Sequence, residues 1–291
     1  MKYAFIEHWR QDFEVTALCK VLEVSRSGFY VWRSRSPSKR AREDERLKVA
    51  IRAAHRRTRE TYGARRLQAE LSSEGFVAGR DRIARLRRIL GIRCKQKRKF
   101  RATTNSNHRL PVAENLLNQQ FEAERPNQAW VTDITYIPTQ EGWLYLAGIK
   151  DLYTCEIVGY SMGSRMTEEL VNTALIRAVE AKRPASGLIY HSDRGSQYCA
   201  HGHQRRVRQY GLRASMSRRG NCYDNAPMES FWGSLKNELV HHCRYATRLE
   251  ALASIREYIE IFYNRQRRHS SLGYVSPAKF ADDYDRRTAV A

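Results

Sequence analysis

The order of strand-like and helix-like segments after residue 126 restricts the fold of this 291-residue chain more than any other feature. Runs rich in β-branched and aromatic residues come first, separated by glycine-containing turns, at Trp130–Pro138, Trp143–Asp151 and Glu156–Met162. Helical and strand patterns then alternate, at 167–182, 188–192, 202–210 and 212–215. An antiparallel three-strand meander followed by this alternation predicts an α/β domain with a mixed, five-stranded sheet.

Three acidic residues stand out in this pattern. Asp133 lies in the middle of the first strand-like run, where a buried acid without a partner is costly. Asp193 follows the apolar run Leu188–Tyr190, and Glu229 lies early in an amphipathic helical segment. Three carboxylates of this kind fit an all-oxygen site for a hard cation such as Mg²⁺ or Mn²⁺.

The helix of Glu229 has a recognisable start, with Asp224 or Asn225 as its cap and Pro227 in its first turn. Lys236 follows Glu229 by seven positions, so both side chains are expected on one face of the helix. Between Asp193 and Glu229 there are 35 residues.

Plainer explanations exist for each of these residues. Asp193 precedes Gly195 and could be a turn residue, Glu229 could be favoured by the helix dipole, and Lys236 could be solvated. Asp151 and Asp224 are competing acids, which we interpret as a strand end and a helix cap.

The acids and their surroundings resemble the D-D-E transposases and retroviral integrases. More closely, the chain resembles the second-reading-frame (OrfB) protein of the IS-three family of bacterial insertion sequences. The motifs that carry this resemblance are YGARRL at Tyr62, WVTDITYI at Trp130, GWLYLAGIKDLYT at Gly142, HSDRGSQY at His191, NAPMESFWGSLKNEL at Asn225 and YNRQRRHSSLGYVSP at Tyr263. They span nearly the whole chain.

The resemblance implies an RNase H-like core at 126–245, in which the strands of Asp133 and Asp193 lie side by side and the helix of Glu229 closes the site. It implies two Mg²⁺ or Mn²⁺ ions, bridged by Asp133, with Asp193 and Glu229 each binding one. Lys236 would contact DNA phosphate near the scissile bond, and His191 and Asn225 would support the site. Water would cut one strand, and the freed 3′-OH would attack another phosphate.

The charge of the chain is unevenly distributed. The formal net charge is +21, and residues 1–120 hold 29 Lys and Arg against 12 Asp and Glu. A basic half joined to a nearly balanced half suggests a nucleic-acid-binding part attached to a catalytic domain. The alternative is a solvated basic surface or a basic binding tail.

The basic half divides into three parts by its patterns. Residues 1–35 are expected to hold a small helix-turn-helix, with Ser25 or Ser27 capping its second helix, although an ordinary helical hairpin fits as well. The stretch RSRSPSKRARED at 33–44 is predicted to be a linker. Residues 36–92 form a basic helical DNA-binding module with helices near 45–59 and up to Glu74, and a third capped by Asp81.

Residues 93–125 read as a basic linker, with a short helix expected at Val112–Phe121. Basic residues on an outward helix face or in this linker are expected to contact DNA, because phosphates could reach them there. These residues are Arg65, Arg66, Arg82, Arg85, Lys97, Arg98 and Lys99. A merely solvated basic face is the alternative for the helical ones. Residues 246–291 are expected to form a C-terminal helix and tail, with an amphipathic helix at 248–264 that packs on the core.

The cysteines, the apolar runs and the first residues of the chain indicate where the protein is located and which cofactors it lacks. Six scattered cysteines without a C-x-x-C pair fit free thiols in a reducing compartment, and no tight Cys/His pair indicates zinc. No apolar run is long enough to span a membrane, and the charged start MKYAFIEHWRQD does not resemble a signal peptide. We therefore expect a cytoplasmic protein, and the resemblance implies a bacterial one associated with the nucleoid. No phosphate-binding loop for ATP is visible in the sequence.

The sequence thus favours a metal-dependent DNA transposase that acts on the terminal inverted repeats of its element and on target DNA, as a homo-oligomer. One alternative is a non-catalytic DNA-binding regulator. Another is the catalytic half of a transposase that needs a first-reading-frame (OrfA) protein, joined by a frameshift fusion, because no leucine-zipper heptads are visible. A non-specific nuclease explains the upstream modules less well.

Overall fold

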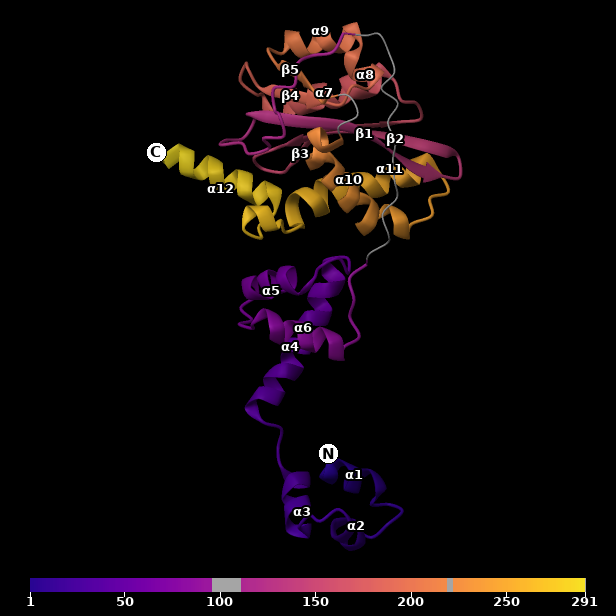
Figure 1. Cartoon of the computed structure of the whole chain (residues 1–291), viewed down its shortest axis with the longest axis vertical. Helices are drawn as coiled ribbons and strands as arrows, with labels where there is room; N and C mark the ends of the chain where they lie inside the picture. Colours follow the sequence, from indigo (N-terminus) through magenta and orange to yellow (C-terminus); the bar gives the residue numbers. More distant parts are fainter. Residues whose placement is uncertain (96–110, 219–221, 291) are drawn as a thin grey trace.

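The computed structural model describes residues 1–95, 111–218 and 222–290. Figure 1 shows three parts in succession along the long axis of the molecule. A small helical unit is at one end, a second helical unit follows, and a sheet flanked by helices forms the other end. The long helix α4 (Lys39–Arg57) leads from the first unit into the second.

The first unit consists of α1 (Lys2–Trp9), α2 (Val15–Val21) and α3 (Arg26–Ser34). The helical pair expected at 13–33 is confirmed as α2 and α3, and Ser25 caps α3 by accepting a hydrogen bond from Gly28 N at 3.0 Å. Helix α1 was not expected. The buried core of this unit is small, consisting of Ile6, Cys19 and Phe29.

The second unit contains α4, α5 (Ala64–Ser73) and α6 (Arg80–Ile89), which pack around Ile51, Leu67 and Ile83. Two expectations are wrong here. The linker predicted at 33–44 is largely helical, since α4 begins at Lys39 with Ser38 as its cap, and its Arg, Ala and Glu residues favour a helix. Asp81 does not cap α6, because the helix begins at Arg80 after Gly79.

Residues 111–121, all described, contain no helix, so the helix expected at Val112–Phe121 is wrong. The side chain of Asn115 accepts hydrogen bonds from Leu117 N and Asn118 N, at 3.1 and 2.9 Å, which closes a turn in place of a helix. Leu116 N donates to Ser215 Oγ at 2.9 Å and ties this segment to the edge of the sheet.

The sheet is five-stranded and mixed, as expected. Its strands are β1 (Ala129–Thr139), β2 (Gly142–Asp151), β3 (Ile157–Gly163), β4 (Ile189–Ser192) and β5 (Arg213–Met216). Their order is β3-β2-β1-β4-β5. Strands β1 to β3 pair antiparallel, whereas β4 pairs parallel with both β1 and β5. This is the topology of an RNase H-like fold.

Helices cover both faces of the sheet and bury two apolar cores (Figure 1). Adjacent residues of β1 serve opposite cores, because side chains alternate along a strand: Trp130 packs with α7 and Val131 packs with α10. One face is covered by α7 (Glu168–Lys182), the short and unexpected α8 (Ser196–Cys199) and α9 (His201–Gln209). The opposite face is covered by α10 (Ala226–Glu238) and α11 (Arg248–Glu257).

The C-terminal part is more helical than expected. The helix predicted at 248–264 begins as α11 and continues as a π-helix, η3 (Tyr258–Gln266). An unexpected helix, α12 (Pro277–Val290), follows, and its Phe280 and Tyr284 pack on Tyr153. Short 3₁₀ turns complete the described chain, at η1 (Cys222–Asn225), η2 (Val240–His242) and η4 (Ser270–Leu272).

Among the helices of the described ranges, none is long and apolar enough to cross a bilayer. The cysteines whose side chains are described are all free thiols, as expected: Cys19, Cys94, Cys155, Cys199 and Cys243.

Candidate active site

The register of the sheet places Asp133 and Asp193 beside each other. Val131 of β1 lies opposite His191 of β4 in the parallel pair. Two residues further along these neighbouring strands are Asp133 and Asp193. Because parallel strands run in the same direction, both carboxylates emerge at one end of the β1–β4 pair, as the sequence predicted.

The Asp133 carboxyl lies in a poorly solvated, negatively charged setting. The side chain is half-buried, and its Oδ2 accepts a hydrogen bond from Trp232 Nε1 at 3.0 Å. Burial raises the pKa of Asp133 well above its usual range, and the negative charges of Asp193 and, to a smaller extent, Glu229 raise it further. All three acids therefore interact electrostatically through Asp133.

Asp193 shapes the turn that leaves β4. Its Oδ1 accepts a hydrogen bond from Gly195 N at 2.8 Å, so the turn interpretation of this residue is correct in structural terms. The side chain is half-buried, and its charge interacts with Asp133.

Asn225 lies at the N-terminus of α10 and supports Asp133 rather than capping the helix with its side chain. Its Nδ2 donates to the carbonyl oxygen of Thr132, the residue before Asp133, at 3.1 Å. Its buried Oδ1 accepts no hydrogen bond from any residue that the structure describes. An unsatisfied oxygen therefore lies beside the backbone of the central acid.

Asp224 does not cap α10, so its interpretation as a helix cap is wrong, whereas Asn225 does occupy the N-cap position, as expected. Its fully buried carboxylate accepts hydrogen bonds from Arg218, Asn115 and Gln119, at distances between 2.7 and 3.1 Å. These bonds, led by the Arg218 side chain, hold the pKa of Asp224 far below its usual range. Asp224 thus joins three chain segments directly before the helix of Glu229.

Glu229 and Lys236 both face the site from α10. Glu229 is exposed in the first turn. The Nζ atom of Lys236 lies 5.0 Å from the ring centroid of Tyr136 on β1. Burial lowers the pKa of Lys236, while the nearby charge of Asp133 opposes this shift. The interaction of Asp133 with both residues agrees with their predicted common face.

His191 is buried and links β4 to β5. Its Nδ1 and Nε2 lie 2.8 and 3.2 Å from the hydroxyl oxygens of Ser215 and Ser217. Burial lowers the pKa of His191 to about 4, so the ring is neutral near pH 7. His191 therefore stabilises β4, the strand that ends directly before Asp193.

Asp151, the other competing acid, is accounted for by structure. It ends β2 and is buried. Its carboxylate accepts hydrogen bonds from Asn127 N at 2.7 Å, Trp130 Nε1 at 3.2 Å and Thr154 N at 2.8 Å. The interpretation as a strand-end residue is confirmed, and its partner Trp130 is buried in the core.

The basic residues predicted to contact DNA differ in burial and in their contacts within the protein. Arg82 and Arg85 do not simply point outward, because both donate to Asp44 of α4, at 2.7 and 2.6 Å. Arg66 is partly buried beside Glu238 of α10, at 3.8 Å. Arg65 lines a surface pocket of about 400 Å³ with Arg80 and Tyr274. Lys97, Arg98 and Lys99 lie outside the described residues.

Three residues of the site were missed from sequence. Trp232, three residues after Glu229 on α10, directs its indole N–H to Asp133. Gly148 pairs with Asp133 across β1 and β2, and a Cβ there would meet Trp232 at 2.8 Å. Lys150 is buried and donates to the carbonyl oxygen of Pro227, in the first turn of α10.

The acids are not arranged as a closed ligand cluster. Within 1–95, 111–218 and 222–290, no three His, Cys, Asp or Glu side chains are grouped closely enough to hold a metal ion. The charges of Asp193 and Glu229 add to the effect of burial in raising the pKa of Asp133. The same repulsion between carboxylates opposes a closer approach of the three acids.

Three protein-family models match this chain. The integrase core domain family matches residues 123–222, a second integrase core domain family matches 210–277, and an HTH-like domain family matches 42–100. A relative from Shigella sonnei, the insertion element IS600 uncharacterized 31 kDa protein, is 65% identical over 94% of this chain and 100% of its own length. Transposase InsF for insertion sequence IS3A, from Escherichia coli K12, is 43% identical over 96% of this chain and 98% of its own.

Solved structures with some similarity include retroviral integrases. One is the HTLV-2 integrase catalytic core domain in complex with magnesium, at 14% identity and a TM-score of 0.43, covering 55% of this chain and 99% of that one. Another is a chain of the simian T-cell lymphotropic virus intasome, at 16% identity and a TM-score of 0.47, covering 74% of this chain and 70% of that one.

Proposed function

The chain belongs to the IS-three (IS3) family of insertion-sequence transposases, and we propose that Asp133, Asp193 and Glu229 form its D-D-E catalytic site. The integrase core places it among polynucleotidyl transferases, and the HTH-like and integrase domains make DNA its partner. The observation that carries the proposal is the register of β1 and β4, which brings Asp133 beside Asp193. The charges of Asp193 and Glu229, which add to the effect of burial in raising the pKa of Asp133, support it.

The residues present suit a pair of divalent cations. The donors are carboxylate oxygens, which Mg²⁺ and Mn²⁺ prefer, and Asn225 Oδ1 supplies an unsatisfied buried oxygen next to the backbone of Asp133. Bound divalent ions would supply positive charge that activates the attacking oxygen and stabilises the leaving oxygen of a phosphodiester. Asp133 would bind both ions, and Asp193 and Glu229 one each.

The other side chains have positioning tasks in this proposal. Trp232 holds Oδ2 of Asp133 through its indole N–H, so that one carboxylate edge keeps its direction. Lys236, half-buried over Tyr136, binds a phosphate oxygen near the scissile bond through Nζ. His191 and Asn225 keep β4 and the start of α10 in place.

The reaction has two in-line displacements at phosphorus. In the first, water attacks a phosphodiester at the end of the element, and the bond to the 3′ oxygen breaks to leave a free 3′-OH. In the second, this 3′-OH attacks another phosphate and displaces its 3′ oxygen. No covalent bond between enzyme and DNA is formed, so no Ser or Tyr nucleophile is needed.

The partners follow from the reaction. The DNA ligands are the terminal inverted repeats of the element and a target duplex, which together require more than one copy of the protein. A first-reading-frame protein, joined by frameshift fusion, is proposed as an additional partner that reads the element ends. The chain would act on chromosomal DNA in the bacterial nucleoid, in units that we propose to be 1–35, 36–92, 93–125, 126–245 and 246–291.

The test is an assay of strand cleavage and strand joining on labelled DNA that ends in the inverted repeat. Wild-type protein is expected to give products only with Mg²⁺ or Mn²⁺, and Glu229→Gln to give none. Glu180→Gln, an exposed glutamate on α7, is the matched control and should behave as wild type. Products that persist in Glu229→Gln would exclude this site.

If the wild type binds DNA without cutting it, the assay is repeated with the first reading frame fused. Cleavage by the fusion alone would identify this chain as a dependent catalytic half. Binding without cleavage by both proteins would favour a non-catalytic regulator.

A further inference from the structure

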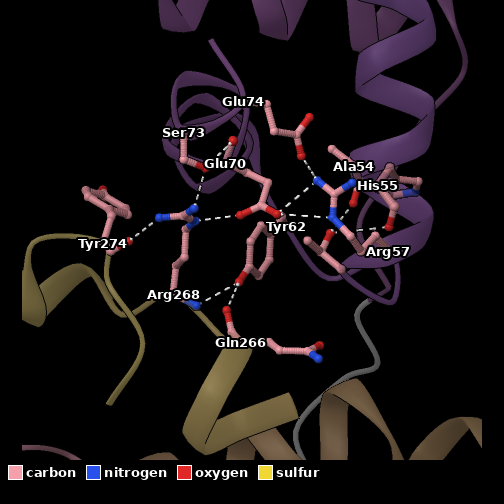
Figure 2. Close-up of polar contacts among 11 residues, drawn as sticks. Ala54, His55, Arg57, Tyr62, Glu70, Ser73, Glu74, Gln266, Arg268 and Tyr274 are labelled. Carbon is pink, nitrogen blue, oxygen red and sulfur yellow. Dashed lines mark hydrogen bonds and ion pairs between the residues drawn. The ribbon is translucent and has the colours of Figure 1, made fainter. Parts of the chain in front are cut away.

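The helical module α4–α6 is attached to the C-terminal part of the chain through the side chain of Arg268 (Figure 2). Arg268 Nε donates to Glu70 Oε2 at 2.6 Å, and Nη2 donates to Ser73 Oγ at 2.7 Å, both on α5. Nη1 donates to the carbonyl oxygen of Tyr274 at 2.9 Å. All three guanidinium nitrogens of one arginine are therefore used at this junction.

The backbone at Arg268 is held as well. Arg268 N donates to the hydroxyl oxygen of Tyr62 at 2.7 Å, and that hydroxyl lies 3.4 Å from the carbonyl oxygen of Gln266, to which it donates. Tyr62 is fully buried and lies just before α5. Side chain and main chain of the same segment thus bind the same module (Figure 2).

Glu70 has a second partner within its own module. Arg57 of α4 donates to Glu70 at 3.0 Å and also pairs with Glu74. Figure 2 shows Glu70 between the two arginines, one from α4 and one from the C-terminal segment. Charged hydrogen bonds that share partners in this way are stronger and more directional than isolated surface pairs.

The preceding residue, Arg267, instead contacts α10, the helix that carries Glu229. Its Nε and Nη2 donate to Glu238, the last residue of α10, at 2.9 and 2.7 Å. Nη2 also donates to Ser234 at 3.2 Å, and Tyr258 donates to the same Glu238 carboxylate at 2.8 Å. Both members of this ion pair are more than nine-tenths buried.

Further contacts close the junction on both sides. Arg59, just after α4, pairs with Glu257, and its guanidinium lies 4.7 Å from the ring centroid of Phe262 in η3. Arg66 of α5 lies 3.8 Å from Glu238. The module therefore contacts α10 directly, in addition to the link through Arg267 and Arg268.

These contacts form a continuous connection from the helical module to Glu229. It runs from Glu70 through Arg268 and its neighbour Arg267 to Glu238, nine residues after Glu229 on the same helix. An α-helix of nine residues is stiff and spans about 13 Å. We infer that Arg267 and Arg268 are positioning residues that fix the distance between the DNA held by the helical module and the bond that is cut.

This inference rests on the proposed function and adds a property to it. If the module and the catalytic site form one rigid unit, the enzyme cuts at a constant number of nucleotides from the DNA segment that the module binds. If the connection is broken, the module can still bind DNA, but the scissile phosphate is no longer presented at one position. The intact connection therefore sets the distance between the DNA-binding module and the cleavage position.

The test maps cleavage at nucleotide resolution on an end-labelled inverted repeat. Wild type should cut at one position. Arg268→Ala should spread cleavage over neighbouring positions and lower the rate at the original one by about 10- to 100-fold, the loss expected from a misplacement of about 1 Å. DNA affinity should remain near that of wild type, which separates lost positioning from lost binding.

Two further variants protect the test against a folding defect. Tyr62→Phe removes only the hydroxyl at the junction and should spread cleavage in the same direction to a smaller extent. Arg268→Lys keeps the charge opposite Glu70 and should recover part of the rate. Lys279→Ala, which removes an exposed ion pair with Asp283 on α12, is the matched control and should cut as wild type.

A second measurement does not depend on cleavage. Fluorophores at the exposed positions Arg46 on α4 and Asp282 on α12 should report one narrow distance distribution in wild type and a broader one in Arg268→Ala. Distance distributions of equal width in wild type and Arg268→Ala would contradict this inference. Cleavage by Arg268→Ala at a single position, at or above the wild-type rate, would contradict it as well. Absence of cleavage by both the wild type and its fusion to the first reading frame would instead count against the proposed function, and the distance measurement would still decide this inference.

Discussion

The indole nitrogen of Trp232 lies 3.0 Å from Oδ2 of Asp133, so helix α10 orients the central acid of the sheet as well as carrying Glu229. One helix thereby contributes the third acid, a donor to the first acid and the lysine that faces them. A change in the position of α10 would alter all three contributions together.

Removal of the indole N–H should weaken the site without removing a ligand. Trp232→Phe keeps an aromatic ring over the sheet but leaves Asp133 Oδ2 without this donor. We expect a fall of about 10-fold in cleavage rate or in apparent Mg²⁺ affinity, because hydrogen bonds to metal ligands typically contribute 10- to 100-fold. The measurement is the rate of cleavage against Mg²⁺ concentration, and an unchanged curve would show that the N–H has no role in orienting Asp133.

The close approach of α10 to the sheet depends on Gly148. A Cβ at this position would meet Trp232 Cη2 at 2.8 Å and Met228 Cε at 3.3 Å. Gly148→Ala should therefore lower the free energy of unfolding by about 1–3 kcal/mol, the usual effect of overpacking. Gly233→Ala on α10 is the control, since its Cβ would have no atom within 4 Å and alanine favours a helix. Thermal or denaturant unfolding would measure both, and equal effects would contradict the tight contact at Gly148.

The buried Asp224 should make stability depend on pH. Its hydrogen bonds, led by that from Arg218, hold its pKa far below the usual range. Its contribution to stability is therefore fully present above the unfolded-state pKa and is lost progressively as pH falls from there through the lower folded-state pKa. Asp224→Asn should lower the free energy of unfolding by about 1–3 kcal/mol at pH 7. The difference between the two proteins should shrink below about pH 4. A difference that stays constant from pH 7 to pH 3 would mean that the charge of Asp224 is unimportant.

A phosphate contact by Lys236 should be visible in the salt dependence of DNA binding. Lys236→Gln should reduce the slope of log affinity against log salt concentration by about 1, because one fewer counterion is released. Lys279→Gln, at an exposed position on α12, should leave the slope as in wild type. An unchanged slope for Lys236→Gln would remove this residue from the DNA interface.

The strands of the sheet could be predicted because their signals are local, whereas the pairing of the two aspartates was implied by the family resemblance. Strands β1 to β3 are long and separated by short turns, and the strand ending before Asp193 is a continuous apolar run. Once the strand order is known, the register brings Asp133 beside Asp193. The face shared by Glu229 and Lys236 follows from helix periodicity alone.

The interpretation of Asp224 as a helix cap was wrong, and the ion pairs of Arg82 and Arg85 were not foreseen, because the partners lie far away in the sequence. Asp224 resembles a helix cap locally, yet its carboxylate binds Asn115 and Arg218 in the folded chain. Arg82 and Arg85 lie on an apparently open helix face, but Asp44, about forty residues earlier, accepts their hydrogen bonds. No local pattern reports such tertiary contacts, since the same side chain can bond to its own helix or to a distant one.

Replacement of Asp193 by a softer ligand tests most directly whether the acids hold the catalytic ions. Asp193→Cys exchanges a carboxylate for a thiolate, which binds Mg²⁺ poorly and accepts softer ions such as Mn²⁺ more readily. The measurement is strand cleavage of the inverted repeat by wild type and variant in each ion. We predict activity of the wild type in both, loss of the variant's activity in Mg²⁺ and partial recovery in Mn²⁺. Wild-type activity of Asp193→Cys in Mg²⁺ would contradict the assignment of the site.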